Sequence, residues 1–204
     1  PAQKALQRLL ERNATELSIP ADYLVARISD WLDPDNDLQQ SGGAEENDYA
    51  ALPHPYYSAN SLMVNKSELR TILDLTPSDY QLVAPLVCVI PQDGVLKINV
   101  NTLKEEQAPL LSGLIPGIDD EAAKKAISAR PSDGYDSVEA FFGELGSNAG
   151  SDASVKALFD VKSSYFQAEY TLETDDSSFV LTTIYKLDQN ANPIVVSRRF
   201  GGPG

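Results

Sequence analysis

The chain has little of the residue types on which many protein sites depend. Its 204 residues include one cysteine and one histidine. A single cysteine cannot form a disulfide within the chain. Two interpretations of Cys88 remain open. It is either a buried thiol in the apolar run 86–90, or its partner lies in a part of the protein outside this chain.

Basic residues are also scarce. There are 16 Lys and Arg against 30 Asp and Glu, which gives a formal net charge of -14 and a pI near 4.3. Such a surface repels nucleic acid and anionic membranes, and it favours cations or basic partners. No run of about 18 apolar residues is present that could span a bilayer. The charged segment 1–13 does not resemble a signal peptide.

Catalytic machinery is hard to assemble from these residues. His54, the only histidine, lies between Pro53 and Pro55 in an extended connector, which suits a surface or packing residue better than a general base. A Cys88–His54 dyad is disfavoured because an apolar strand does not support a thiolate. No glycine-rich phosphate-binding loop is present. We therefore expect a protein that is not an enzyme.

The first three quarters of the chain have the apolar spacing of short helices. Apolar stripes and capping residues predict them at 3–13, 20–31, 65–75, 104–114, 119–129 and 137–145, and a further short helix begins at Thr76-Pro77. Short β-type segments are expected at 87–90 and 95–100, around a turn at 92–94. Residues 146–154 have the composition of a linker.

After this linker the pattern changes to strands. Apolar and β-branched residues predict three of them, at 165–172, 179–187 and 193–199, separated by two polar turns. Three strands form a sheet too small to stand comfortably alone. The expected fold class is α+β, with a helical domain at 1–150 that contains the acidic loop 30–49, and an antiparallel β part at 151–204.

The stretch from Asp30 to Tyr49 is the strongest candidate site. It is rich in acidic residues and has no Lys or Arg, and Gly42 and Gly43 let the chain fold back on itself. Oxygen ligands gathered by a loop suit calcium, and the alternative is a solvated acidic loop. It is not an EF-hand, because Leu38 stands where that motif needs glycine. The candidate ligands are Asp33, Asp35, Asp37, Glu45, Glu46 and Asp48.

A second motif has the shape of a helix-hairpin-helix. The turn Ile115–Ile118 joins two predicted helices, and in nucleic-acid-binding versions such a turn offers backbone N–H groups to a phosphate. Here Asp119, Asp120 and Glu121 place negative charge where the phosphate would lie. We therefore interpret the motif as a packing module and expect no nucleic acid to bind. A DNA-uptake type of binding module remains the alternative function.

Several short motifs occur in an order that resembles one known family, the K-type minor pseudopilins of the bacterial type II secretion system. The resemblance covers nearly the whole chain, and its strength lies in the ordered set of motifs. They are Asp30-Trp31-Leu32-Asp33, Gly43-Ala44-Glu45 with Tyr49, Ser67-Glu68-Leu69-Arg70, Ile98-Asn99-Val100-Asn101-Thr102, Ala129-Arg130-Pro131 and Ser163-Ser164-Tyr165-Phe166.

The resemblance implies a non-enzymatic protein at the tip of the periplasmic pseudopilus, which initiates or caps the filament during protein export. It implies I-type and J-type minor pseudopilins as partners, with exoproteins or the secretion pore as further contacts. It also implies a helical domain inserted into a pilin-like sheet, with structural Ca²⁺ in the helical domain. The six acidic residues are then the candidate ligands, and Asp33, Asp35 and Glu45 are the first choice among them.

The family has an apolar N-terminal helix and first strands that are absent from this chain. The resemblance therefore implies that the full-length protein is periplasmic and anchored in the inner membrane through that helix. It also implies that a partner for Cys88 could lie in a missing strand. Within the helical domain that the resemblance implies, Trp31 and Tyr49 are expected to anchor the acidic loop by packing on either side of it.

Overall fold

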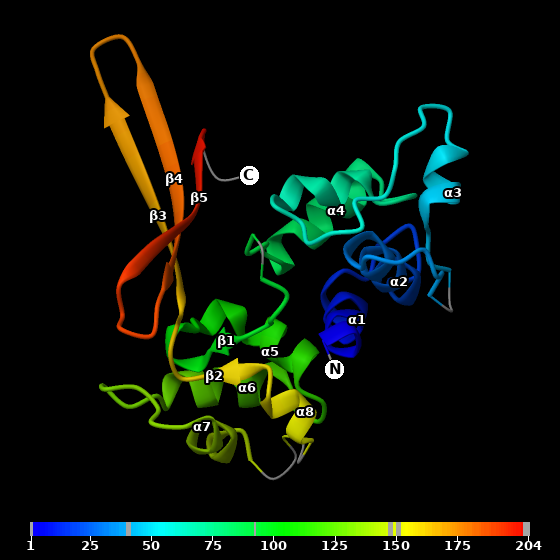
Figure 1. Cartoon of the computed structure of the whole chain (residues 1–204). Coiled ribbons are helices and arrows are strands. Elements are labelled where there is room, and N and C mark those ends of the chain that lie inside the picture. Colours follow the sequence, from blue (N-terminus) through cyan, green and yellow to red (C-terminus); the bar gives the residue numbers. More distant parts are fainter. Residues whose placement is uncertain (1, 40–41, 92, 147–148, 150–151, 202–204) are drawn as a thin grey trace.

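The computed structural model describes residues 2–39, 42–91, 93–146, 149 and 152–201. They form two helical units and a sheet of three strands, arranged around a thin connector (Figure 1). We call residues 2–91 the first helical unit, residues 98–162 the second helical unit, and both together the helical part. The predicted α+β class, with helices first and an antiparallel meander last, is confirmed.

The first helical unit is built around a core of aliphatic and aromatic side chains that includes Leu10, Leu24, Trp31, Tyr49 and Val83. Pro77 begins its last α-helix, and the Thr76 hydroxyl accepts a hydrogen bond from Asp79 N, as the predicted cap requires. Its helices are α1 (Ala2–Asn13), α2 (Ala21–Leu32), α3 (Glu46–Ala50), the 3-10 helix η1 (Lys66–Thr71), α4 (Pro77–Val83) and the 3-10 helix η2 (Ala84–Leu86).

The second helical unit has its own core, in which Val100, Leu111, Phe141 and Phe159 are almost fully buried. Two short parallel strands close it, with Ile98 opposite Phe159. Its elements are β1 (Ile98–Asn99), the 3-10 helices η3 (Val100–Thr102) and η4 (Glu105–Gln107), α5 (Ala108–Leu114), α6 (Asp120–Ser128), α7 (Val138–Glu144), α8 (Ala153–Lys156) and β2 (Phe159–Asp160).

Helix α1 contributes to both cores. Its Ala5 and Leu9 lie in the core of the second unit, whereas Leu10 belongs to the core of the first unit. The helix can approach α5 closely because residue 113 is glycine: a Cβ there would lie 3.1 Å from the Cα of Leu9. Arg8 also donates to the Leu114 carbonyl at 3.0 Å. The two helical units therefore share one helix.

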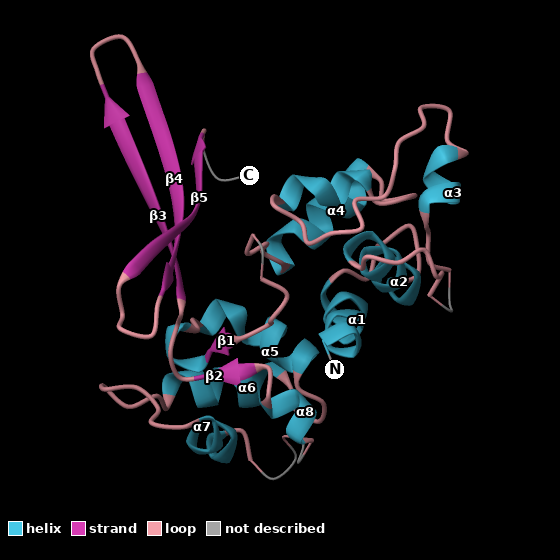
Figure 2. Ribbon diagram, viewed as in Figure 1, coloured by secondary structure: helices cyan, strands magenta, loops and turns pink. Residues whose placement is uncertain are grey.

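The three strands form an antiparallel meander in the order β3 (Tyr165–Glu173), β4 (Ser178–Leu187), β5 (Pro193–Phe200). They project away from the helices (Figures 1 and 2). Because side chains alternate between faces, Tyr170, Leu172 and Phe179 share one face. Phe200 joins them through its pairing with Leu181. These aromatic and aliphatic side chains are exposed, so one face of the sheet is apolar and open.

The predicted strand at 87–90 is wrong. Among the described residues, this segment pairs with no other strand, and Val87 and Val89 instead pack against the first core as extended chain. Cys88, which lies between them, is a free thiol and is exposed, so the interpretation as a buried thiol is also wrong. Of the predicted segment 95–100, only Ile98 and Asn99 form a strand.

Other differences concern the ends of elements. The helix predicted at 65–75 is the shorter 3-10 helix η1, capped by Asn65. The predicted linker 146–154 lies partly outside the described residues, and α8 begins within it at Ala153. Val155, Leu158 and Phe159 then return to the second core. The division at residue 150 stays a prediction, but packing groups residues 153–160 with the helices before them.

Candidate metal centre

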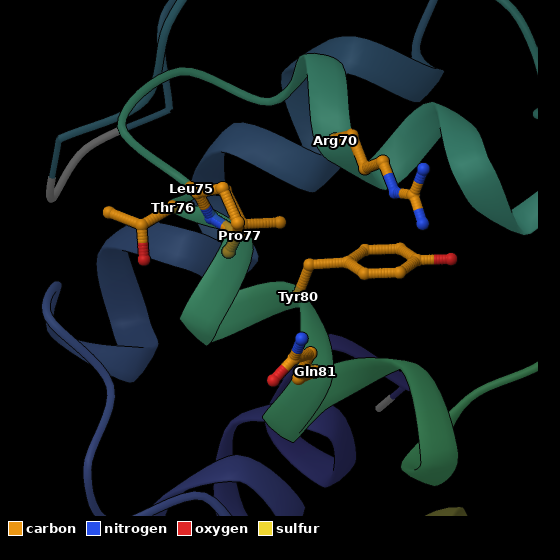
Figure 3. A pocket seen from close by; sticks show the side chains of 6 residues that line it. All are labelled: Arg70, Leu75, Thr76, Pro77, Tyr80 and Gln81. Atoms are coloured by element: carbon orange, nitrogen blue, oxygen red, sulfur yellow. The ribbon is translucent and has the colours of Figure 1, made fainter.

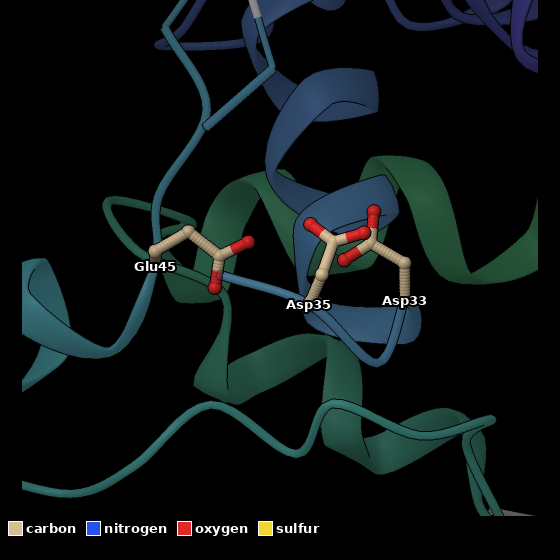
Figure 4. Close-up of side chains that lie close together, drawn as sticks. All are labelled: Asp33, Asp35 and Glu45. Atoms are coloured by element: carbon tan, nitrogen blue, oxygen red, sulfur yellow. The ribbon is translucent and has the colours of Figure 1, made fainter. Parts of the chain in front are cut away.

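Three of the six predicted ligands lie together at the end of α2. Asp33 and Asp35 follow this helix directly, and Glu45 precedes α3 on the returning arm of the loop. Each offers a carboxylate oxygen, and these oxygens all lie within 4.8 Å of one another. Figure 4 shows the Asp33 and Asp35 carboxylates side by side and the Glu45 side chain reaching toward them.

Two glycines allow the chain to return to this point. Gly42 has φ +85, a conformation that other residues rarely adopt, and a Cβ there would lie 2.5 Å from the Tyr23 ring. Gly43 is needed for space, because its Cβ would lie 2.0 Å from a carboxylate oxygen of Asp30. The predicted reversal at these glycines is therefore confirmed, and each glycine has its own physical reason.

Asp30 holds the backbone of the loop through hydrogen bonds. Its side chain is completely buried, and its carboxylate accepts hydrogen bonds from Ala44 N at 2.8 Å and Gln39 N at 3.2 Å. Asp30 was counted in the acidic stretch but not among the ligands. The sequence feature that could have indicated its burial is its position next to Trp31, on a helix whose other buried residues are apolar.

Glu45 is the least satisfied group of the centre. Its side chain is only 3% exposed, and neither carboxylate oxygen has a hydrogen-bond partner among the described residues. Burial, followed by the negative charges of Asp30, Asp33 and Asp35, raises the pKa of Glu45 to about 7. Burial also raises the pKa of Asp30 and of Asp33.

No basic side chain compensates these charges. None of the ion pairs between described residues involves Asp33, Asp35 or Glu45. The Oδ1 atom of Asp33 is buried without a partner, as are both Glu45 oxygens. Buried carboxylates without donors are costly unless a cation or a proton neutralises them. Oxygen-only donors gathered by a loop fit a hard cation such as calcium.

The other three predicted ligands lie outside this group. Asp48 Oδ2 accepts a hydrogen bond from Glu45 N at 2.9 Å, so it takes part in the start of α3 and fixes the backbone of Glu45. Asp37 is exposed, and its N–H donates to Asp35 Oδ1 at 2.9 Å. Glu46 is exposed in the first turn of α3.

Aromatic packing holds both arms of the loop. The rings of Trp31 and Tyr49 are buried and meet edge to face, with centroids 5.2 Å apart. Tyr56 lies against the same pair, 5.3 Å from Tyr49, and its hydroxyl donates to the Thr71 carbonyl. The predicted role of Trp31 and Tyr49 as anchors of the loop is therefore confirmed.

The helix-hairpin-helix motif is occupied by intramolecular contacts. Asp119 caps α6 by accepting a hydrogen bond from Ala122 N at 2.8 Å, where a phosphate would otherwise bind. Asp120 forms an ion pair with Arg12 of α1 at 2.9 Å and accepts a hydrogen bond from Ser112. The motif therefore packs α1 against the second helical unit, in agreement with its interpretation as a packing module.

A surface pocket of about 320 Å³ lies beside η1 and α4. The Arg70 guanidinium lies over the Tyr80 ring, 4.3 Å from its centroid, and these two side chains form one wall (Figure 3). The rest of the lining combines Leu75, Thr76, Pro77 and Gln81. This set offers no nucleophile paired with a base. His54 and Cys88 are both exposed and do not line it.

Within the described ranges, no helix combines the length and the apolar character needed to cross a bilayer.

The chain matches one protein family along most of its length. Two family models, both described as Type II secretion system (T2SS), protein K, match residues 1–92 and residues 98–162. The gap between them falls in the connector between the two helical units.

Curated relatives carry the same name. The chain is 35% identical over 98% of its length to type II secretion system protein K of Aeromonas hydrophila. It is 36% identical over 99% of its length to the protein of that name from Pectobacterium carotovorum subsp. carotovorum. It spans 60% of the length of each of these relatives.

A solved structure shares the fold. It is a chain in the crystal structure of the GspK-GspI-GspJ complex from the type 2 secretion system of enterotoxigenic Escherichia coli. The match has a TM-score of 0.82 at 24% identity and covers 98% of this chain and 70% of that chain. The helical part and the three-stranded sheet therefore follow an arrangement already seen in that complex.

Proposed function

Because the chain belongs to the type II secretion system protein K family, we propose that it is part of a non-enzymatic minor pseudopilin at the tip of the secretion pseudopilus. There it would initiate or cap the filament during protein export. The observation that carries this proposal is the family match over both helical units.

We infer that its partners are the I-type and J-type minor pseudopilins. The structural neighbour comes from a complex named GspK-GspI-GspJ, and this name supports the inference. The open apolar face of the sheet adds a physical reason, because exposed aromatic side chains such as Phe166, Phe179 and Phe200 favour burial in a larger fold or assembly. We place the full-length protein in the periplasm, anchored in the inner membrane by a helix outside this chain.

Mixing experiments test this proposal. The chain is combined with the soluble domains of I-type and J-type pseudopilins from the same system and applied to a sizing column. We expect a 1:1:1 complex that elutes before each component. The variant Phe179→Ser removes an exposed aromatic side chain from the apolar face and should reduce the share of protein that elutes as the complex. Separate elution of all three native proteins at micromolar concentrations would contradict the partner assignment.

We also propose that Asp33, Asp35 and Glu45 hold a structural calcium ion. The supporting observation is that one Glu45 oxygen lies within 4.8 Å of a carboxylate oxygen of each of these residues, while neither buried Glu45 oxygen has a hydrogen-bond partner among the described residues. The ion would supply positive charge that lets the three carboxylates remain ionised together. It would thereby fix the loop between α2 and α3. Asp37, Glu46 and Asp48 remain candidates for the outer part of the site.

Calorimetric titration of the metal-free protein tests the site directly. We expect one strong calcium-binding event and much weaker magnesium binding, because magnesium demands a small octahedral site and gives up its water reluctantly. Calcium should also protect the bonds near residues 36–43 from proteases. Equal protease sensitivity with calcium and with chelator would contradict the proposal.

The alternative of nucleic-acid binding is not favoured by any contact in the structure. Asp119 and Asp120 occupy the hairpin end of α6, and the net charge of -14 opposes a polyanion. A mobility-shift assay at low salt is the direct check, and sub-micromolar affinity for DNA would overturn our preference.

A further inference from the structure

Strands β3 and β4 make few hydrogen bonds and ion pairs with the helical part among the described residues. Strand β3 follows β2 through residues 161–164, and the β3–β4 hairpin then extends away from the helices (Figures 1 and 2). Among the described residues, the hydrogen bonds and ion pairs that run from β3 and β4 to the helical part or its connector converge on Asp93. This residue lies in the connector between the two helical units.

The two carboxylate oxygens of Asp93 have different partners. Oδ1 accepts a hydrogen bond from Val95 N at 2.9 Å and so fixes a turn of the connector. Oδ2 accepts a hydrogen bond from the Tyr165 hydroxyl and lies 3.6 Å from Lys186 Nζ. One side chain thus joins the connector to two strands of the sheet.

The sheet residues of this contact support each other. Tyr165 and Lys186 are direct partners in the β3–β4 register and therefore share a face. Lys186 Nζ also lies 5.1 Å from the centroid of the Tyr165 ring, in cation–π geometry. The Asp93 side chain is only 18% exposed, whereas the Lys186 side chain is 48% exposed, so the ion pair with Lys186 is partly open to solvent and the hydrogen bond from Tyr165 is the main contact.

The contact lies at a position from which it can strongly affect the orientation of the sheet relative to the helical part. Tyr165 is the first residue of β3 and Lys186 is next to the last residue of β4, so both are at the foot of the sheet. The covalent link at residues 161–164 lies beside them, and at its start the Val161 carbonyl accepts a hydrogen bond from Asn101 Nδ2 at 3.1 Å. A further contact beside this link restricts rotation of the sheet about it.

We propose that Asp93, Tyr165 and Lys186 form a latch that fixes the angle between the sheet and the helical part. Without the latch, the sheet turns about residues 161–164 while both parts stay folded. The open apolar face of the sheet then changes its direction relative to the helical units. This inference concerns the chain itself and does not depend on the secretion role or on the metal centre.

Pulsed electron paramagnetic resonance on a doubly labelled chain tests the latch. Cys88 is exposed and can carry one spin label, and its neighbours Val87 and Val89 tie it to the first core. Asp176→Cys, in the turn between β3 and β4, carries the other. The decisive variant is Y165F/K186Q, which removes both sheet partners and leaves the Asp93 turn intact. The matched control is Y170F, whose lost hydroxyl pairs only within the sheet, with Tyr185 at 3.1 Å.

We expect one narrow distance distribution in the parent protein and in Y170F, and a distribution at least twofold wider in Y165F/K186Q. A distribution in Y165F/K186Q as narrow as that of Y170F overturns the proposal, as does a wide distribution in the parent. Circular dichroism checks that each variant is folded. If Y165F/K186Q does not fold, D93A takes its place with D188A as its control, and the same twofold criterion applies.

Discussion

Two carboxylates in the first helical unit are both buried, but they differ in their hydrogen-bond donors and in the direction in which their pKa is shifted. Asp79, 1% exposed, accepts hydrogen bonds from the backbone N–H and the hydroxyl of both Ser18 and Thr76. These bonds lower its pKa to about 2, although burial alone would raise it. Glu45, 3% exposed, has no donor on either oxygen among the described residues, and its pKa is raised to about 7.

The comparison distinguishes a buried carboxylate that has hydrogen-bond donors from one that has none among the described residues. Asp79 needs nothing further, because four donors satisfy it and connect the α1–α2 loop with the start of α4. Glu45 needs either a proton or a cation. Burial by itself therefore does not indicate a metal site, whereas burial without donors beside two other carboxylates does.

The largest effect is expected from Asp79→Ala. The change leaves two backbone N–H groups and two hydroxyls without their acceptor, which should lower the free energy of unfolding by about 3 kcal/mol. Urea denaturation with and without calcium measures it, and the loss should be the same in both. Asp188→Ala is the control, because Asp188 accepts hydrogen bonds only within its own turn. A loss that calcium restores would contradict the comparison.

A somewhat smaller effect is expected from Glu45→Gln. In native protein, calcium at 100 times its dissociation constant should raise the free energy of unfolding by about 2.7 kcal/mol. The Gln variant should lose this gain, and its metal-free form should be at least as stable as metal-free native protein. Thermal melts with calcium or chelator show both. Glu16→Gln, which changes an exposed acidic residue outside the acidic loop, should keep the calcium response, and an equal loss in both variants would count against the site.

The two carboxylates should give opposite pH dependence in calcium-free buffer. Between its ordinary pKa of 4.5 and its folded pKa of about 7, Glu45 holds a proton in the folded state that the unfolded state has released. Stability should therefore fall as pH rises through this window, and the raised pKa values of Asp30 and Asp33 act in the same direction.

For Asp79 the sign is reversed. Between its ordinary pKa of 3.8 and its folded pKa of about 2, the unfolded state binds more protons, so stability should fall as pH decreases. Denaturation at pH 5 and pH 8 tests the Glu45 part, and Glu45→Gln should flatten it. Denaturation between pH 4 and pH 2 tests the Asp79 part, and Asp79→Asn should flatten that one.

The smallest effect is expected from Asp37→Asn. Asp37 is exposed and lies outside the group of three carboxylates, so its charge should change calcium affinity by less than about threefold. Calorimetric titration measures this directly. A tenfold loss would make Asp37 a ligand, and the centre would then be larger than the three residues that the structure brings together.

Local sequence signals predicted elements that have strong periodicity and clear caps. Helix α4 begins at Pro77 after the Thr76 cap, and the three strands of the sheet lie close to their predicted ranges. The segment 87–90 misled, because apolar β-branched residues predict a strand even where no partner strand is available. Helix α8 was missed, because the Gly, Ser and Asn residues before it have the composition of a linker.

For the site, the sequence indicated the loop, and the three ligands expected first, Asp33, Asp35 and Glu45, are the ones that lie together. Asp33, Asp35 and Asp37 alternate along the chain, yet only the first two meet Glu45. The buried carboxylates of Asp30 and Asp79 accept hydrogen bonds from backbone N–H groups of distant segments, such as Ala44 N and Ser18 N. Such donors depend on the tertiary fold, and no local spacing in the sequence reports them.

The placement of α1 has a consequence for recombination between relatives. The two matched family segments, residues 1–92 and 98–162, look like cassettes that a crossover in the connector could exchange. Yet α1 belongs to the first segment by sequence, while its Ala5 and Leu9 fill the core of the second. A chimera joined at the connector would carry a helix shaped for the wrong neighbour. Chimeras that fold should therefore take α1 and α5 from the same parent, and substitutions in the two segments should occur together.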